Sequence, residues 1–122
     1  MPAENQPAFD WLRRADDDLR VGEMSVSASP SICWAAAFHA QQAAEKALKG
    51  LLTHHQLAFE KTHDIRYLLQ LCETIDPDAR VIAERAVALT RYAVASRYAL
   101  LRQDPSESEA LSALALAREI IG

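Results

Sequence analysis

Three proline steps divide most of this chain into segments that begin as helices begin. Each proline follows a residue that can cap a helix, in the steps Ser29-Pro30, Asp76-Pro77 and Asp104-Pro105. A capping side chain accepts a backbone N–H of the first turn, and proline suits the first helical position because no N–H is needed there. Glu107 stands three residues after Asp104, which is the spacing of a capping box. The pattern therefore predicts three helix starts.

Two further helices are predicted, the first near the N-terminus and a short one after the long connection that follows the second helix. With only three glycines in 122 residues, and with abundant alanine and leucine, the chain favours helices over strands and tight hairpins. Short connections between helices favour antiparallel neighbours. We expect one all-α domain over residues 1–122, an up-and-down antiparallel bundle of four to five helices. The segments run from about Phe9 to Met24, Pro30 to Leu52, Asp64 onward, Asp78 to Leu101 and Pro105 onward.

The composition is that of an ordinary soluble domain that needs neither disulfides nor a metal for stability. Half of the residues are hydrophobic and a quarter are charged, and the formal net charge is −4. An acidic chain makes a general nucleic-acid coat protein a poor interpretation. No apolar run approaches the length of a membrane span, and the N-terminus lacks a signal-peptide pattern, so we expect a cytoplasmic protein without membrane contact. Cys33 and Cys72 are expected to be free thiols in apolar surroundings.

The helical periodicity predicts which faces are buried. In the first helix the apolar face is Ala8, Trp11, Leu12, Ala15 and Leu19. Asp18 borders that face, whereas Arg13, Asp16 and Asp17 point away. The fourth helix places Ile82, Ala86, Leu89, Ala93 and Leu100 on one line. The fifth offers Leu111, Leu114, Ala115 and Ile121. The short third helix is predicted to start with Thr62 or Asp64 as its cap and to be anchored by Ile65, Leu68 and Leu69.

The second helix is predicted to contact protein on two sides. One broad sector is made of small side chains that allow close packing: Cys33, Ala36, Ala37, Ala40, Ala43, Ala44, Ala47 and Leu51. The nearly opposite sector mixes large apolar and polar side chains: Trp34, Phe38, Gln41, Gln42, Glu45, Leu48, Lys49 and Leu52. Between them, only a narrow sector with His39, Lys46 and Gly50 is expected to be freely solvated.

Two interpretations of the mixed sector remain open. Glu45 and Lys49 form an i,i+4 pair in the favourable order, and such pairs often lie on a surface and contribute a few tenths of a kcal/mol. Alternatively, Gln42, Glu45 and Lys49 form a half-buried polar network, inside the bundle or at a dimer interface. We favour the dimer interface.

Three segments together resemble the HEPN domain family of small prokaryotic helical proteins. They are "AAFHAQQAAEKALKGLL", "KTHDIRYLLQL" and "YAVASRYA", and the first helix fits through "WLRRADDDL". The Gln-Gln-Ala-x-Glu-Lys block and the Thr-His-Asp step are specific in combination. The resemblance spans about Trp11 to Ile121, nearly the whole chain.

The resemblance implies a helical bundle that usually dimerises. Such proteins are frequently encoded beside a small nucleotidyltransferase, with which they form a complex or a toxin–antitoxin pair. Some members of the wider superfamily are metal-independent ribonucleases, which use an arginine and a histidine separated by four to six residues, at a dimer cleft. We therefore expect a homodimer, with a nucleotidyltransferase-type protein partner and with nucleotide or RNA as ligand.

The chain departs from the ribonuclease pattern at the motif itself. Arg91 is followed at the relevant distances by Ser96, Arg97 and Tyr98, and the four histidines are His39, His54, His55 and His63. Without a group that titrates near neutrality beside Arg91 or Arg97, acid–base cleavage lacks its agent. We predict a non-catalytic module. The alternative is a ribonuclease in which Arg91 or Arg97 works with His63 or Tyr98. The family form with proline after Ser-Arg-Tyr is also absent, because Ala99 stands there.

Ligand contacts are predicted at the basic residues of the second and fourth helices. Arg97 and Tyr98, assisted by Lys46 or Lys49, can meet a nucleotide or RNA phosphate. The competing interpretation is that these side chains only pack and cover a surface. His63 is more typical of a structural hydrogen-bonding residue. No metal site is predicted, because His54 and His55 point apart on a helix and have no carboxylate or thiol at ligand spacing, and we expect no cofactor.

Overall fold

The computed structural model describes residues 2–62, 64–74 and 105–121, and all regular structure in these residues is helical. The predicted all-α fold is therefore confirmed. The predicted fourth helix, about Asp78 to Leu101, lies outside the described residues together with Arg91, Ser96, Arg97 and Tyr98, and His63 is outside them as well. The described helices are α1 (Pro2–Ser27), α2 (Cys33–His54), α3 (Ile65–Cys72) and α5 (Glu107–Ile121).

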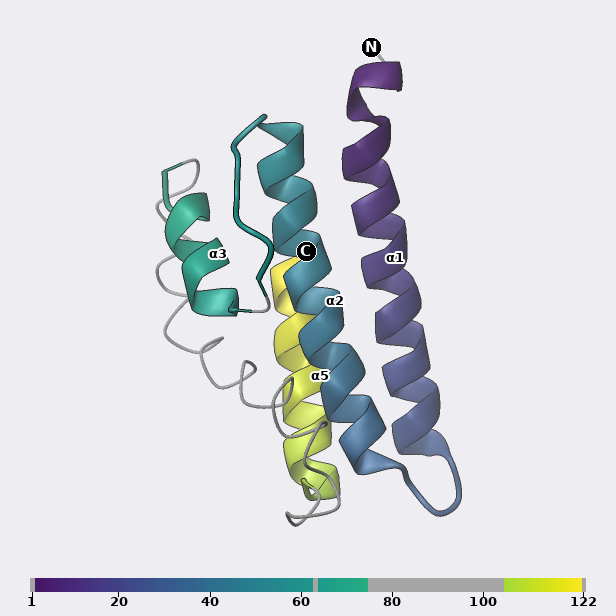
Figure 1. Ribbon diagram of the computed structural model, residues 1–122. Helices are drawn as coiled ribbons and strands as arrows, with labels where there is room; N and C mark the ends of the chain where they lie inside the picture. The colour runs from purple at the N-terminus through teal and green to yellow at the C-terminus, as the bar shows by residue number, and fades with distance from the viewer. Residues whose placement is uncertain (1, 63, 75–104, 122) are drawn as a thin grey trace.

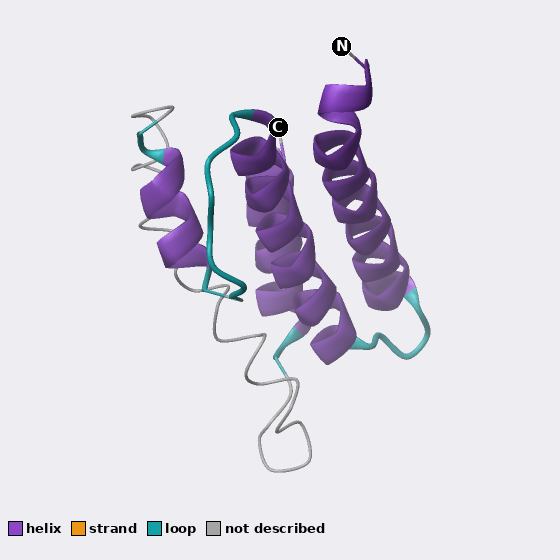
Figure 2. Ribbon diagram, turned by 45° about the horizontal axis from the view of Figure 1, so that its top comes forward, coloured by secondary structure: helices purple, strands orange, loops and turns teal. Residues whose placement is uncertain are grey.

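The three long helices pack side by side around α2. Figure 1 shows α1 and α2 antiparallel and joined by a short loop, with α5 running in the same direction as α2. The connection after α2 lies between α2 and α3 in both ribbon views (Figures 1 and 2). Helix α2 contacts α1, α3 and α5, and α1 also contacts α5. The central position predicted for the second helix is thus confirmed.

The alanine residues of α2 allow this helix to lie at the centre of the bundle. The small-residue sector of α2 is buried almost throughout, and its members are Ala36, Ala37, Ala40, Ala43, Ala44 and Ala47. Larger side chains fill the remaining core from α3 and α5, including Ile65, Leu68, Leu69 and Leu114, all of which are at most 2% exposed. Because alanine loses no side-chain entropy and keeps helix axes close, the core combines high helix propensity with close packing.

Two glycines mark the closest approaches between helices. A Cβ on Gly22 would lie 2.7 Å from Leu114 Cδ2 and 3.2 Å from the carbonyl oxygen of Ala36. A Cβ on Gly50 would lie 3.1 Å from Trp11 Cβ. All three distances are shorter than ordinary van der Waals contact, so α1 approaches its neighbours at points where no side chain fits.

The sector of α2 that was expected to be solvated faces α1 instead, so that prediction is wrong. Gly50 is buried against α1, and the side chains of His39 and Lys46 are only 28% and 24% exposed. Helical periodicity identified this sector as polar because it carries His39 and Lys46. A polar sector can still be an interface when the facing helix supplies a matching charge, which Asp18 does here.

Helix α2 begins later than the proline pattern predicts. Its N-cap is Ile32, which makes no side-chain capping bond, and the helix starts at Cys33 rather than Pro30. The residues after Pro30 are held by the end of α1: the Ile32 backbone N–H donates to the Ser25 carbonyl oxygen at 2.8 Å, and Ser31 Oγ to that of Val26 at 2.7 Å. They complete the C-terminal end of α1, which extends to Ser27.

Helix α5 has a capping box, but two residues beyond the predicted one. Ser106 Oγ accepts the Glu109 backbone N–H, and Glu109 Oε1 accepts the Ser106 backbone N–H, both at 3.1 Å. Glu107 is the first residue of α5, and Asp104 lies outside the described residues. The sequence contains the same motif at Ser106-Glu107-Ser108-Glu109, in which a glutamate stands three residues after a serine.

The buried face of α5 also differs from the prediction. Leu111 is 47% exposed and Ala115 is exposed, whereas Leu114 is buried as expected. The other core residues of this helix are Ala110, Ala113, Leu116 and Ala117. The alanine side faces inward because it allows α5 to approach the alanine sector of α2.

Helix α3 starts as predicted. Asp64 Oδ1 accepts the Tyr67 backbone N–H at 3.4 Å, and Thr62 Oγ1 accepts the Asp64 backbone N–H at 3.0 Å. Ile65, Leu68 and Leu69 are buried. Among the helices described, none is both long and apolar enough to cross a bilayer.

Candidate functional site

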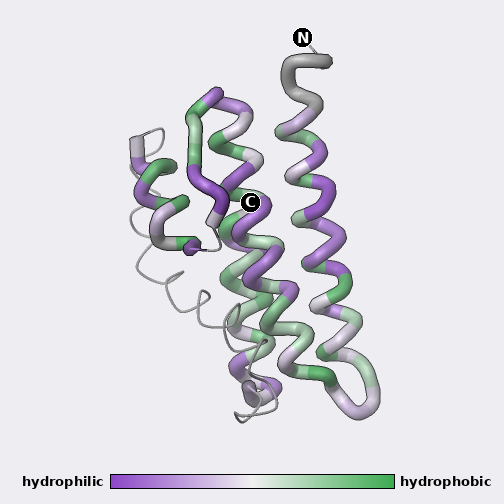
Figure 3. Tube along the Cα trace, viewed as in Figure 1, coloured by the Kyte–Doolittle hydropathy of each residue, from purple (hydrophilic) through white to green (hydrophobic). Residues whose placement is uncertain are grey.

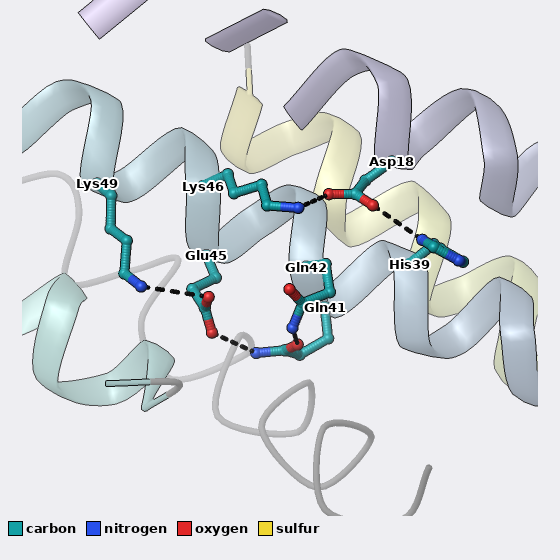
Figure 4. Close-up of polar contacts among 7 residues, drawn as sticks. All are labelled: Asp18, His39, Gln41, Gln42, Glu45, Lys46 and Lys49. Carbon is teal, nitrogen blue, oxygen red and sulfur yellow. Dashed lines mark hydrogen bonds and ion pairs between the residues drawn. The ribbon is translucent and has the colours of Figure 1, made fainter. Parts of the chain in front are cut away.

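A carboxylate on α1 joins two polar side chains of α2. Asp18 Oδ1 lies 2.8 Å from Nδ1 of His39, and Asp18 Oδ2 accepts a hydrogen bond from Lys46 Nζ (Figure 4). Since an ionised carboxylate only accepts, the imidazole N–H at Nδ1 donates to it, and this leaves Nε2 on the far side of the ring. The Asp18 side chain is 12% exposed. The cluster is a half-buried, charge-assisted link between two helices.

A second polar cluster lies along α2 itself. Gln42 donates from Nε2 to Gln41 Oε1 at 2.7 Å, Gln41 donates from Nε2 to Glu45 Oε1 at 3.2 Å, and Lys49 donates to Glu45 Oε2 at 3.3 Å (Figure 4). Gln41 is fully buried, and the side chains of Glu45 and Lys49 are 3% and 8% exposed. The Glu45–Lys49 pair is therefore not a surface pair. Gln41, Gln42, Glu45 and Lys49 form one hydrogen-bonded chain within the protomer, and the place of Gln42, Glu45 and Lys49 at a dimer interface stays a prediction.

The second cluster also contacts α1, through Trp11. Lys49 Nζ lies 5.6 Å from the centre of the Trp11 ring, within the range of a cation–π contact. Among the described residues, Glu45 is the one hydrogen-bond acceptor that Lys49 meets. A buried ammonium group with spare donors is held here by one carboxylate and one aromatic face. Helix α1 therefore meets α2 at two polar points: Asp18 contacts His39 and Lys46, and Trp11 contacts Lys49.

The charges of the two clusters balance. Lys46 is paired with Asp18, and Lys49 is paired with Glu45. An incoming phosphate would have to compete with a carboxylate for either ammonium group, so the two lysines do not form a ready anion site by themselves. Their proposed role as ligand contacts stays a prediction, together with that of Arg97 and Tyr98, which lie outside the described residues.

The structure brings together three residues of the predicted network and adds four residues that the sequence did not assign to a site. Gln42, Glu45 and Lys49 lie in one network, as proposed. The additional residues are Trp11, Asp18, His39 and Gln41. A signal for two of them existed in the sequence: His39, Lys46 and Gly50 recur at helical spacing on one line of α2, and Asp18 borders the apolar face of α1.

The remaining candidate groups show no site for a metal ion. In the parts of the chain that the structure describes, no three histidine, cysteine, aspartate or glutamate side chains are grouped as ligands. His54 and His55 lie edge to face at the end of α2, with ring centres 5.1 Å apart. Cys33 and Cys72 are free thiols, and burial raises the pKa of Cys72 from 9.0 to about 11. That thiol is a poor nucleophile near neutrality.

Fold and site together define a small all-α bundle whose central helix holds a buried polar network. The family model that describes the HEPN domain matches residues 8–122, nearly the whole chain. The chain belongs to the HEPN domain family, as the resemblance of its motifs predicted. A comparison with curated proteins and one with solved structures gave no match.

Proposed function

We propose that this chain is a non-catalytic HEPN module that works as a cytoplasmic dimer and binds a protein partner. The observation that carries the proposal is a family match over residues 8–122 in a chain whose Arg91 has no histidine at the ribonuclease spacing. Arg97 and Tyr98 stand where that histidine is required. The chain therefore has the domain without the histidine that would act as the general acid–base group.

The partner class that fits best is a small nucleotidyltransferase, in a complex or in a toxin–antitoxin pair. This step rests on the resemblance of the motifs. The charge pairs made by the two lysines of α2 support a binding role over a catalytic one, because Lys46 pairs with Asp18 of α1 and Lys49 pairs with Glu45. A lysine that is paired with a carboxylate can stabilise the helix that carries it. Its charge is then largely taken up by the pair and is not free to take part in a reaction.

A nucleotide or RNA is the proposed further ligand, through Arg97 and Tyr98, with Lys46 or Lys49 in support. Gln42 is the accessible end of the α2 network, since it is only half buried whereas Glu45 and Lys49 are buried. A second subunit or a ligand that reaches this network would therefore meet Gln42 first, and the two charged residues would act behind it.

Light scattering and co-purification test the proposal. We expect the purified chain to be a dimer and to co-purify with the nucleotidyltransferase encoded next to it when the two are expressed together. A strict monomer that retains no partner would overturn the proposal. The gene beside this one is the most informative single observation, because a minimal nucleotidyltransferase there identifies the partner to express.

A ribonuclease assay tests the alternative in the same preparations. We expect no cleavage of single-stranded RNA above that of a mock purification. Cleavage that survives extensive purification, disappears in Arg97→Ala and persists in Arg14→Ala would establish the enzyme instead. Arg14 is a matched control because it is an exposed arginine on α1. The variant His39→Ala is assayed alongside these two, because His39 is a histidine within the described residues and is held by the Asp18 carboxylate.

A further inference from the structure

The His39 ring has one nitrogen that the contact between α1 and α2 leaves unused. Nδ1 lies 2.8 Å from Asp18 Oδ1 and donates to it, so in the neutral ring the lone pair stands at Nε2. Among the residues that the structure describes, Asp18 is the one side chain that hydrogen-bonds to this ring, and Figure 4 shows the second ring nitrogen turned away from it. The pair therefore presents a nitrogen nucleophile in a defined tautomer.

The ring is held in place and is still accessible. Phe38 lies edge to face against it, with ring centres 5.2 Å apart, and a Cβ on Gly22 of α1 would lie 3.6 Å from His39 Cβ. The His39 side chain is nevertheless 28% exposed, and Asp18 covers its Nδ1 edge. Hydrophilic residues run through the middle of α1 beside it (Figure 3). A small polar reagent can therefore reach a ring whose orientation is already fixed, which lowers the entropic cost of a reaction there.

Asp18 favours reactions in which Nε2 forms a new bond. When Nε2 gives its lone pair to an electrophile while Nδ1 keeps its proton, the ring becomes positively charged. That charge then lies against a carboxylate whose side chain is only 12% exposed, where water screens the attraction less than at a surface. The product of attack at Nε2 is therefore stabilised more than the same product at a solvated histidine.

Lys46 points to a phosphoryl group as the electrophile. Its ammonium group has three N–H donors, and Asp18 is the one acceptor that the described residues give it. A phosphoryl group brings about two negative charges and three acceptor oxygens, which suit the remaining donors. Free phosphate would have to compete with Asp18 for this lysine. A phosphoryl group bonded to His39 is instead held next to the same carboxylate, and the flexible lysine can turn to it.

We propose that His39 accepts a phosphoryl group at Nε2 from a donor of the phosphoramidate class, which carries its phosphoryl group on nitrogen. The Nε2 lone pair forms the new N–P bond, and the P–N bond of the donor breaks with its electron pair leaving on the donor nitrogen. Nδ1 keeps its proton and donates to Asp18. The bond that breaks and the bond that forms are of the same kind, so no further reactant is needed. The inference goes beyond the proposed function, because it requires neither a dimer nor a nucleotidyltransferase.

Potassium phosphoramidate tests the site on the purified full chain. Its nitrogen carries three protons at neutral pH, so the leaving group is ammonia. If access alone decided the reaction, His55 would react before His39, because His55 is exposed at the end of α2. We expect His39 to react about tenfold faster than His55, since a charge-assisted hydrogen bond stabilises its product. Peptide mapping by mass spectrometry under alkaline conditions, which preserve phosphohistidine, measures both rates.

The position of the phosphoryl group on the ring is a second measurement on the unmodified protein. Phosphorus NMR distinguishes the Nδ1 and Nε2 isomers of phosphohistidine, and we expect the Nε2 isomer at His39 because Asp18 occupies Nδ1. The same reaction in concentrated urea is the control. There the preference for His39 over His55 and the preference for Nε2 that comes from Asp18 should both be lost.

Variants of Asp18 separate its role toward the ring from its role in stability. Asp18→Asn keeps the shape of the side chain and removes its charge, so we expect the rate at His39 to fall about tenfold. Asp18→Ala frees Nδ1, and both isomers are expected at His39 while circular dichroism shows a folded protein. Loss of stability alone does not change which nitrogen reacts. Asp17→Asn is the matched control, because Asp17 is exposed, and it should react as the unmodified chain does.

The charge of Lys46 is tested in the same way. Lys46→Gln is expected to slow the reaction at His39 about threefold, the effect of one partly exposed ion pair. Lys61→Gln is the control, since Lys61 is exposed in the connection after α2 and should leave the rate unchanged.

The outcomes decide the inference. Faster reaction at His39 than at any other histidine, at Nε2 and with slowing by Asp18→Asn, supports it. Reaction of another histidine at an equal or higher rate overturns it, and so does a product at Nδ1 in the unmodified chain. A preference for His39 that persists in urea also overturns it, because the local sequence and not the Asp18 contact would then be its cause.

Discussion

Asp18 and His39 are 21 residues apart in the chain, and their side chains lie 2.8 Å apart across the contact between α1 and α2. The same carboxylate accepts a hydrogen bond from Lys46. One acidic side chain on the first helix therefore fixes the orientation of the central helix through two of its polar residues. Local sequence could not show this, because the partners belong to different helices.

Replacing Asp18 should destabilise the protein although no apolar contact is removed. Asp18→Ala leaves His39 and Lys46 half buried without their acceptor, and we expect the free energy of unfolding to fall by about 1–3 kcal/mol. Urea denaturation followed by circular dichroism measures it. The neighbouring Asp17→Ala is the control, because Asp17 is exposed and should change stability by less than about 0.5 kcal/mol. Equal losses in the two variants would contradict a structural role for the Asp18 cluster.

The Glu45–Lys49 pair should show strong coupling. Glu45→Gln and Lys49→Met each leave one buried partner uncompensated, at a cost of about 2–4 kcal/mol, whereas the double variant removes both charges together. We expect a coupling energy of about 1–3 kcal/mol in a double-mutant cycle of chemical denaturation. Additive losses, within about 0.5 kcal/mol, would show that the pair behaves as an exposed surface pair despite its burial.

Gly22→Ala should destabilise the protein, although alanine is the better helix former. In an open helix this change would stabilise by about 1 kcal/mol. Here the new Cβ would lie 2.7 Å from Leu114 Cδ2 and 3.2 Å from the Ala36 carbonyl oxygen. Leu114 can rotate away, but the carbonyl oxygen is fixed in the backbone of α2, and we expect a net loss of about 1–2 kcal/mol. A higher melting temperature for Gly22→Ala would refute the close approach of α1 and α2.

Stability should fall with pH between about 9 and 11 because of Cys72. Burial raises the pKa of this thiol from 9.0 to about 11, so the unfolded chain loses the proton first as the pH rises. Ionisation then favours the unfolded state, by up to about 1.4 kcal/mol per pH unit inside this window and by nothing below it. Cys72→Ala is less stable at neutral pH, but its unfolding free energy should decline less steeply in the window. Parallel pH profiles for the two proteins would contradict the buried state of the thiol.

The capping box of α5 predicts that Ser106→Ala and Ser108→Ala differ in their effect on the free energy of unfolding. Ser106→Ala removes the acceptor of the Glu109 N–H and should cost about 1 kcal/mol. Ser108 is exposed inside the first turn, and Ser108→Ala should leave the unfolding free energy nearly unchanged. If Asp104 were the cap instead, as the proline pattern predicts, Ser106→Ala and Ser108→Ala would lower the melting temperature by equally small amounts.

Much of the local structure followed from the residues themselves. Asp64 and the apolar spacing of Ile65, Leu68 and Leu69 predicted α3 correctly, since caps and periodicity are local properties. The start of α2 was displaced from Pro30 to Cys33, because the residues after Pro30 complete the end of α1 instead. Where a helix ends depends on which terminal backbone N–H and C=O groups find hydrogen-bond partners, and those partners come from outside the helix.

The sequence by itself determined that the chain is helical, that the alanine sector of the second helix is buried, and that the HEPN motifs are present. The first two rest on composition or on spacing within one helix, and the third rests on motifs in several segments of the sequence. Only the tertiary structure decided that the polar sector of His39, Lys46 and Gly50 faces α1, and that α5 buries Ala113 and Ala117 rather than Leu111 and Ala115. Periodicity orders the faces of a helix, but which face is buried depends on the charge and size of the helix that comes to lie against it.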